Sequence, residues 1–236
     1  MLIFLLIGQS NMVGRGPLDA DAGVPDLPIY RFTPQGVCEK AADPLHSDGP
    51  KKGGVGPGMS FAQAVASSMP GTEIGLIPCA LGDTPLARWV KSGDLFEMAV
   101  RRTRTVRQSG TLAAILWHQG ESDARSLEDS GTYEDRLRGM ILDVRHDLGA
   151  ADIPFIAGEL GTFLSAVDFP GAALINASLR GLGGRVPNYA CVSSGALTDK
   201  GDHKHFDTPS QRELGRRYAS AFLNNAWAVS VGSQHS

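Results

Sequence analysis

The feature that most constrains this chain is an unbroken apolar run near its start, residues 2–7 (LIFLLI), which ends abruptly in the polar sequence Gly8-Gln9-Ser10-Asn11. An apolar run of strand length that stops at a turn is typical of a strand buried on both faces, as in a parallel sheet. Ligands and catalytic groups of such sheets gather at the carboxyl ends of the strands. Ser10 therefore stands where a nucleophile is expected, although a serine after a strand also serves as a turn former or a helix N-cap.

The apolar run does not fit a secretion signal. It has no basic segment before it and leads straight into GQSN without a small-residue cleavage site. We therefore expect it to be the first strand of the mature protein and expect a cytoplasmic location. No other stretch is long enough to cross a bilayer, so no membrane association is predicted.

The three cysteines, Cys38, Cys79 and Cys191, lie far apart and without C-x-x-C spacing. This pattern argues against a disulfide framework and against a structural zinc site. Cys79 follows an apolar run, and we interpret it as a small buried residue rather than a nucleophile because no histidine lies at a recognisable spacing.

The composition describes an ordinary globular chain, with 236 residues of which 42% are hydrophobic and 20% charged. We find no internal repeat or linker and predict a single domain over residues 1–236. The formal net charge of −3, without a basic tract, gives no electrostatic footprint for nucleic acid. The sequence makes no prediction of the oligomeric state.

Apolar runs of strand length alternate with helical periodicity along most of the chain, which predicts a parallel sheet covered by helices on both faces. With right-handed crossovers this is a three-layer α/β/α sandwich around a mainly parallel, five-stranded sheet. Residues 15–57 are rich in Gly and Pro with little periodicity, and we expect a long loop there that is a binding loop, a lid or disordered. The predicted strands are 2–7, 73–79, 112–117, 154–157 and 189–192, and the predicted helices are 59–69, 95–108, 133–148, 170–182 and 209–227.

Polar turns follow the first three predicted strands: residues 8–11, then Gly82-Asp83-Thr84, then residues 118–123 (HQGESD). In a doubly wound sheet such turns can converge on one crevice. A fourth polar segment, residues 198–207, precedes the last predicted helix. These segments are where we look for chemistry.

Within the fourth segment, Asp202 and His205 stand three residues apart. On a turn that enters a helix, this spacing can set the carboxylate against the imidazole, fix its tautomer and leave the other ring nitrogen free to take a proton from a serine hydroxyl. The same residues also fit a turn residue and a surface histidine. His203 is a rival base without an aspartate three residues before it, and the roles of His203 and Asp207 stay open.

Together these motifs resemble the sequence blocks of the SGNH (GDSL-like) hydrolases. The match comprises GQSNM at 8–12, LGDT at 81–84, WHQGESD at 117–123 and D-x-x-H-F at 202–206. The pattern is most similar to the branch of sialate O-acetylesterases and acetylxylan esterases, carbohydrate esterase family 6. The resemblance implies a flavodoxin-like SGNH hydrolase fold. It also implies a serine esterase that removes short acyl groups from carbohydrate O-esters without a cofactor or metal.

Carried over to this chain, the resemblance makes Ser10 the nucleophile, His205 the general base and Asp202 its orienting carboxylate. The oxyanion hole would combine the backbone N–H groups of Ser10 and Gly82 with the side chain of Gln119. Most SGNH hydrolases have an asparagine at that last position, so Gln119 is a departure from the wider pattern. The remaining motif residues are assigned to bracing the site or touching substrate: Gln9, Asn11, Glu121 and Asp123.

The segment after the second predicted strand contains Arg88 and Trp89. Trp89 is a candidate to stack on a sugar ring and Arg88 a candidate to meet a substrate carboxylate, and both are equally compatible with structural roles. The expected partner is a small acetylated carbohydrate or another short-chain ester. Acetylated xylan, acetylated sialic acid and simple acyl esters all stay open.

Two other classes of function compete with the esterase. A metal-dependent hydrolase could draw its ligands from the His and Asp residues of the third and fourth polar segments, but it has no H-E-x-x-H spacing and leaves Ser10 unexplained. A non-catalytic carbohydrate-binding or nucleotide-binding module would use the same sheet, yet the turn at 8–16 fits neither glycine-rich phosphate motif.

Overall fold

The computed structural model describes residues 1–19, 26–47, 53–225 and 227. Seven strands form one sheet in the order β3-β2-β4-β1-β5-β6-β7, in which every neighbouring pair is parallel except β2 and β3. The strands are β1 (Leu2–Gly8), β2 (Ile29–Phe32), β3 (Cys38–Lys40), β4 (Ile74–Pro78), β5 (Thr111–His118), β6 (Phe155–Gly158) and β7 (Tyr189–Val192).

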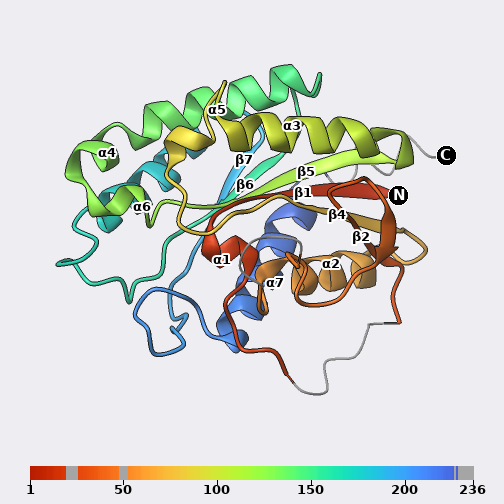
Figure 1. The fold of residues 1–236 in the computed structure, drawn as a ribbon, viewed down its shortest axis with the longest axis horizontal. Coiled ribbons are helices and arrows are strands. Elements are labelled where there is room, and N and C mark those ends of the chain that lie inside the picture. The colour runs from red at the N-terminus through yellow and green to blue at the C-terminus, as the bar shows by residue number, and fades with distance from the viewer. Residues whose placement is uncertain (20–25, 48–52, 226, 228–236) are drawn as a thin grey trace.

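Helices cover both faces of the sheet, so the predicted three-layer α/β/α architecture is confirmed (Figure 1). Helices α2 and α7 pack against each other on one face, and α3, α5 and α6 lie on the other (Figure 1). The helices are α1 (Ser10–Val13), α2 (Pro57–Ser68), α3 (Asp94–Val106), α4 (Leu127–Gly131), α5 (Tyr133–Asp147), α6 (Ala172–Gly181) and α7 (Thr208–Leu223).

The apolar run of β1 divides its side chains between the two layers. Ile3, Leu5 and Ile7 join the cluster formed with α3, α5 and α6, whereas Leu2, Phe4 and Leu6 join the cluster formed with α2 and α7. Alternate side chains of a strand point to opposite faces, so a strand covered on both faces needs an unbroken apolar run. This is why residues 2–7 contain no polar residue.

The sheet has two more strands than the five predicted, and this corrects the strand count. The five predicted strands are present, while β2 and β3 fall inside residues 15–57, the region expected to be a loop. All three residues of β3 are exposed, and β2 is buried only at its two ends, so neither carries a clear apolar pattern. Residues 20–25 and 48–52, on which the prediction of a lid partly rests, lie outside the described residues.

The predicted long helices are all present, and the structure corrects the ends of some of them. The closing helix α7 ends at Leu223 rather than at residue 227, and α6 begins at Ala172 rather than at residue 170. The short helices α1 and α4 were not predicted, because four or five residues are too few for a periodic pattern. Within the described part of the chain, no helix is both long and apolar enough to cross a membrane.

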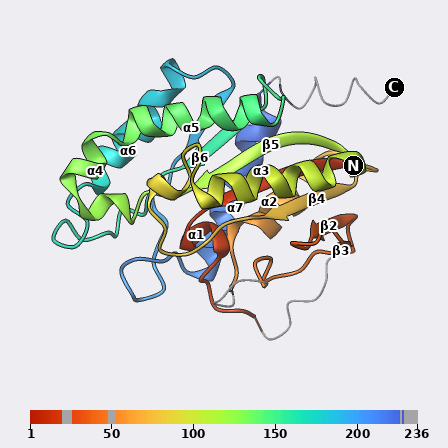
Figure 2. The ribbon, with the colours of Figure 1, turned by 45° about the horizontal axis from the view of Figure 1, so that its top comes forward.

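The position of β1 determines where a site can form. β1 lies between β4 and β5, and the strands that follow it in sequence leave in opposite directions across the sheet. This is a topological switch point, where the loops at the carboxyl ends separate and leave a crevice. The turn that carries Ser10 follows β1 directly at that crevice, beside the turn after β4 (Figure 2).

Candidate active site

Ser10 is the first residue of the short helix α1 and follows β1 after a single intervening residue. Gly8 makes this turn possible: its φ is +129°, and a Cβ atom there would lie 2.1 Å from the backbone oxygen of His118. Only glycine tolerates both the left-handed backbone and this close approach to β5. Ser10 is therefore set rigidly at the carboxyl end of the central strand, with 2% of its surface exposed.

The segment between β7 and α7 brings His205 to Ser10. The Nε2 atom of His205 lies 2.9 Å from the Oγ atom of Ser10, and its Nδ1 atom lies 2.7 Å from Oδ2 of Asp202. The other carboxylate oxygen of Asp202 accepts the backbone N–H groups of Lys204 and His205. The structure thus brings Ser10, His205 and Asp202 into one chain of hydrogen bonds.

The protonation states suit this arrangement. Burial works against the charged form of Asp202, but hydrogen bonds from the His205 ring, the His205 backbone and Lys200 outweigh it and hold the Asp202 pKa well below its usual range. An ionised Asp202 can only accept, so the Nδ1 atom of His205 carries the proton and Nε2 is free to accept from the Ser10 hydroxyl.

The pKa of His205 is lowered from its ordinary value. The main cause is burial, and the charges of Lys204 and Arg15 act in the same direction, while the Asp202 carboxylate opposes them. His205 is therefore neutral at neutral pH, which is the form that can take a proton from a serine.

Two backbone N–H groups face the space beside Ser10. Within the described residues, neither the Ser10 nor the Gly82 N–H donates a hydrogen bond to the protein. A Cβ atom on Gly82 would lie 3.6 Å from the Ser10 Cβ atom, so the turn after β4 approaches the serine closely. These donors match the backbone part of the oxyanion hole predicted from the sequence, and their role stays a prediction.

The side-chain amide of Gln119, predicted as the third donor of that oxyanion hole, donates to protein acceptors in this structure. Its Nε2 atom lies 2.6 Å from Asp123 Oδ2 and 3.0 Å from the Thr84 backbone oxygen, and both are acceptors. Since a primary amide has two hydrogens, none is left for a substrate oxygen. Gln119 is also fully buried, with Tyr133 donating to its backbone and side-chain oxygens.

The other motif residues form the buried support of these turns. Gln9 Oε1 accepts the Ser122 backbone N–H at 3.2 Å and lies 3.3 Å from Gln119 Nε2, and Asn11 donates to Glu121. Asp123 is 1% exposed and accepts from Arg136 and from the Leu86 backbone N–H, which fits its predicted role in bracing the turn.

The two candidates for substrate contact after the second predicted strand differ in exposure. Trp89 is 1% exposed, packs edge-on against Trp117 and donates its indole N–H to Thr84. Arg88 forms a two-point ion pair with Asp94. Trp89 thus has the structural role that the sequence left open, whereas a substrate contact of Arg88 stays a prediction.

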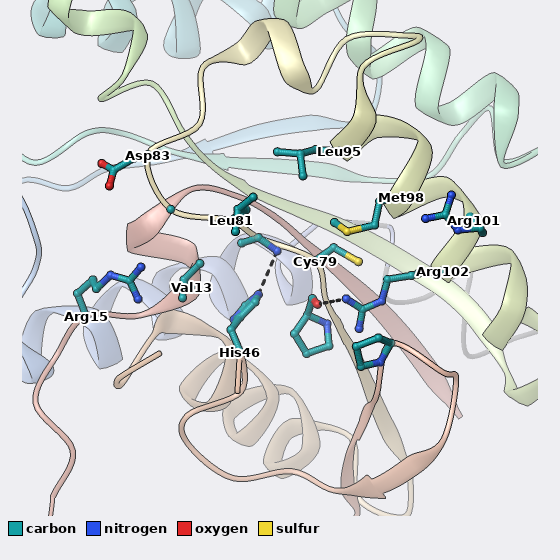
Figure 3. A pocket seen from close by; sticks show the side chains of 14 residues that line it. Val13, Arg15, His46, Cys79, Leu81, Asp83, Leu95, Met98, Arg101 and Arg102 are labelled. Carbon is teal, nitrogen blue, oxygen red and sulfur yellow. Dashed lines mark hydrogen bonds between the residues drawn. The ribbon is translucent and has the colours of Figure 1, made fainter. Parts of the chain in front are cut away.

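A cavity of about 540 Å³ borders the site on the side of Gly82. Leu81, Leu95 and Met98 contribute apolar surface, and His46 accepts a hydrogen bond from the Ala80 backbone at the centre of the cavity (Figure 3). Arg15 and Asp83 lie at one end and Arg101 and Arg102 at the other (Figure 3). Burial and the nearby arginines lower the His46 pKa to about 3, so this histidine is neutral and the arginines carry the positive charge.

Several residues that shape this region were not predicted to take part. Arg15 approaches Gly82 closely, and Lys204 forms a 2.6 Å ion pair with Asp83 that joins the His205 segment to the turn after β4. Tyr133 holds Gln119. Arg15 and Lys204 are adjacent in sequence to motif residues, but nothing in the pattern indicates where their long side chains reach.

The ligands that a metal-dependent hydrolase would need are not gathered in one place. Asp207 caps the start of α7, and His203 is exposed near Asp199. In the described ranges no three His, Cys, Asp or Glu side chains form a group able to hold a metal ion.

Comparison with known proteins places this geometry in context. A family model described as "Carbohydrate esterase, sialic acid-specific acetylesterase" matches residues 1–224. A probable carbohydrate esterase of Arabidopsis thaliana is 35% identical over 242 residues, which cover 94% of this chain and 90% of that protein.

Solved structures agree with these matches. The X-ray structure of the Arabidopsis thaliana protein superposes with a TM-score of 0.86 at 34% identity, covering 95% of this chain and 98% of that one. NanS superposes with a TM-score of 0.79 at 19% identity, covering 94% and 96%. A carbohydrate acetylesterase from Xanthomonas citri superposes with a TM-score of 0.71 at 20% identity, covering 96% of this chain and 56% of that one. At such identities the last two comparisons indicate a common fold.

Proposed function

Because this chain belongs to the carbohydrate esterase family of sialic acid-specific acetylesterases, we propose that it removes acetyl groups from carbohydrate O-esters through an acyl-enzyme at Ser10. Membership confirms the resemblance that the sequence motifs indicated, and it makes the chain a carboxylic ester hydrolase. The serine mechanism and the substrate go beyond family membership and rest on the site. The observation that carries them is the hydrogen-bonded series Ser10–His205–Asp202, with separations of 2.9 and 2.7 Å.

In the first half of the reaction, the Ser10 oxygen attacks the acetyl carbonyl carbon while His205 Nε2 takes the hydroxyl proton. The carbonyl π electrons move onto oxygen, and the N–H groups of Ser10 and Gly82 stabilise that charge. When the tetrahedral intermediate collapses, the bond to the sugar oxygen breaks and His205 returns its proton to the leaving alcohol. Asp202 keeps the imidazole in the required tautomer and stabilises the imidazolium.

In the second half, His205 takes a proton from water, whose oxygen attacks the acetyl carbon bound to Ser10. The ester bond to Ser10 breaks, acetate leaves, and the proton returns to the Ser10 oxygen. The free enzyme is restored without any cofactor. The proton that passes between Ser10 Oγ and His205 Nε2 moves between atoms 2.9 Å apart in the resting site.

The cavity beside Gly82 supports a substrate that carries a negative charge. Its lining includes Arg15, Arg101 and Arg102 but a single acidic residue, Asp83. None of these three arginines forms an ion pair with a carboxylate among the residues that the structure describes. Asp83, the acidic residue of the lining, is paired with Lys204 instead. We therefore favour an acetylated acidic sugar, whose carboxylate would meet the arginine side of the cavity.

The direct test is substitution of the nucleophile. Ser10→Ala is expected to abolish hydrolysis of a chromogenic acetate ester, because among the described residues no other hydroxyl lies on His205 Nε2. Circular dichroism and the thermal midpoint should match those of the wild type. Ser109→Ala, at an exposed serine beside the opposite end of β5, is the matched control and should keep full activity. Retained turnover in Ser10→Ala would rule out the mechanism.

A further inference from the structure

The side-chain amide of Asn11 joins three segments beneath the proposed nucleophile. Its Nδ2 atom donates to Glu121 Oε1 at 2.6 Å and to the Lys204 backbone oxygen at 3.2 Å. Its Oδ1 atom accepts from the Phe206 backbone N–H at 3.2 Å and from Gln211 Nε2 at 3.4 Å. Both ends of the amide are therefore used, and Asn11 is fully buried.

The two backbone groups that Asn11 holds flank His205 on either side. A primary amide has a donor and an acceptor on one plane, so it can pair with a carbonyl and an N–H as a neighbouring strand would. No other side-chain type of this size has both functions. Asn11 is also the residue directly after Ser10, so the same residue fixes the distance between nucleophile and base.

The His205 segment holds its own shape independently of Asn11. Asp199 accepts the N–H groups of Gly201 and His203, and the Lys200 N–H donates to the His205 backbone oxygen. The Asp202–His205 contact is internal to the segment. The segment is tied to its surroundings by the buried Phe206 ring and by the exposed Lys204–Asp83 pair, which is a weak constraint in water. Loss of the Asn11 contacts would therefore move Asp202 and His205 together, away from Ser10.

Glu121 determines which way the Asn11 amide faces. Its Oε1 atom accepts only if Nδ2 points toward it, and that orientation directs Oδ1 toward Phe206. Glu121 is fully buried, and its Oε1 atom lies 3.8 Å from Nε2 of His118. Burial raises the pKa of Glu121 and lowers that of His118 to about 3. His118 is therefore neutral and does not form an ion pair with the Glu121 carboxyl group. In the described part of the chain, the side chain that hydrogen-bonds it is that of Asn11, beside a hydrogen bond from its own backbone N–H.

We propose that Asn11 and Glu121 are positioning residues for His205. Asn11 hydrogen-bonds the backbone on both sides of the base, and Glu121 sets the orientation of the Asn11 amide. This inference rests on the proposed roles of Ser10 and His205. It assigns to this buried pair the placement of the base against the nucleophile, with no contact to substrate.

Isosteric substitutions test the proposal. Asn11→Asp removes the donor to the Lys204 oxygen, and a shift of about 1 Å in the base is expected to lower kcat about a hundredfold with KM unchanged. Glu121→Gln keeps an acceptor for Asn11 and should retain kcat within about threefold, whereas Glu121→Met, of similar shape but without the acceptor, should lose at least about tenfold. All assays use the full chain and one chromogenic acetate ester.

The double variant Asn11→Asp with Glu121→Gln separates positioning from stability. The new amide at position 121 can donate to the new carboxylate, so the thermal midpoint should recover toward that of the wild type. The Lys204 oxygen would still face an acceptor, so kcat should stay low. Recovery of kcat together with the midpoint would reduce the pair to a structural role, and wild-type kcat in Asn11→Asp would overturn the proposal outright.

The variants at positions 10, 11 and 205 distinguish an error in the positioning role of Asn11 from an error in the proposed mechanism. If Ser10→Ala and His205→Ala are inactive while Asn11→Asp is fully active, the mechanism stands and the positioning role is wrong. If Ser10→Ala retains activity, the mechanism itself is wrong.

Discussion

His205 is held by groups of three kinds: the Asp202 carboxylate on one ring nitrogen, the Ser10 hydroxyl on the other, and the Asn11 amide on its backbone neighbours. The spacing D-x-x-H allows the first contact, because three residues on a turn can bring a carboxylate to an imidazole, but alone it also fits a turn residue and a surface histidine. The second contact spans 195 residues of sequence and required the family motifs.

For individual residues, the sequence did not reveal the direction in which each side chain points. Gln119 was assigned to the oxyanion hole because its motif position matches, yet its amide turns inward to Asp123 and Thr84. Trp89 was a candidate for stacking because it follows the second polar turn, yet it packs in the core against Trp117. Position along the chain predicted the region correctly, whereas the hydrogen-bond partners of each group depend on residues far away in sequence.

The protonation of His205 leads to a pH prediction. The neutral imidazole is the active form, and the pKa of His205 is lowered below its ordinary value of 6.5. Activity should therefore be complete at neutral pH and should be lost only as the pH falls through an apparent pKa below 6.5. The measurement is kcat/KM for an uncharged acetate ester as a function of pH.

Asp202→Asn is the matched variant for this profile. Since the Asp202 carboxylate raises the His205 pKa, its removal should shift the acid limb to still lower pH while kcat falls through loss of the correct tautomer. An acid limb well above 6.5 in the wild type would contradict the burial of a neutral His205.

At the scale of elements, the strands that surround β1 were predictable and the edge strands were not. A strand buried on both faces must be apolar throughout, so β1, β4 and β5 are conspicuous in the sequence. β2 and β3 lie at the edge of the sheet, where an exposed face accepts any residue. The turns that carry Ser10 and Gly82 follow the central strands β1 and β4, which is why their location could be predicted although β2 and β3 could not.

The close approach of β1 and β5 at Gly8 gives a prediction for these elements. In Gly8→Ala the new Cβ atom would clash with the His118 backbone oxygen in a left-handed conformation. We expect a loss of about 3 kcal/mol in the free energy of unfolding and loss of esterase activity, since Ser10 is displaced. Urea denaturation and an acetate ester assay measure the two effects.

Gly71→Ala is the control for backbone strain alone. Gly71 also has a positive φ of +83°, but no atom lies within 4 Å of its added Cβ. Its expected cost is about 1 kcal/mol with activity unchanged. Equal effects of the two substitutions would show that the contact with β5 does not position Ser10.

At the scale of the whole molecule, the distribution of charge sets the cavity apart. The chain carries a formal net charge of −3, and many of its arginines form ion pairs, including Arg31, Arg136, Arg185 and Arg212. The cavity nevertheless has Arg15 at one end and Arg101 and Arg102 at the other (Figure 3). This arrangement was not predictable, because Arg15 follows β1 whereas Arg101 and Arg102 are neighbours on α3, and only the fold brings these two segments to one cavity.

The charge of the cavity gives a prediction for specificity. Arg101→Gln should lower kcat/KM about fivefold for an acetyl ester of an acidic sugar and leave that for a neutral acetylated xylo-oligosaccharide unchanged. Added salt should weaken the wild-type preference for the acidic substrate, because it screens exposed charges. Arg138→Gln, which removes an equal charge from the exposed surface of α5, is the control. Equal loss on both substrates would contradict an anion-selective cavity.

The central claim is that Ser10 carries the acetyl group during turnover. The most direct measurement is acid quenching within the first turnovers on a chromogenic acetate ester, followed by peptide mass spectrometry. When deacetylation is the slower half of the reaction, we expect a burst of released alcohol that matches the enzyme concentration. We also expect an acetyl group on the peptide containing Ser10. In Ser10→Ala neither should be seen. Steady turnover by the wild type with an acetyl group on a different residue, or an undiminished burst in Ser10→Ala, would contradict it.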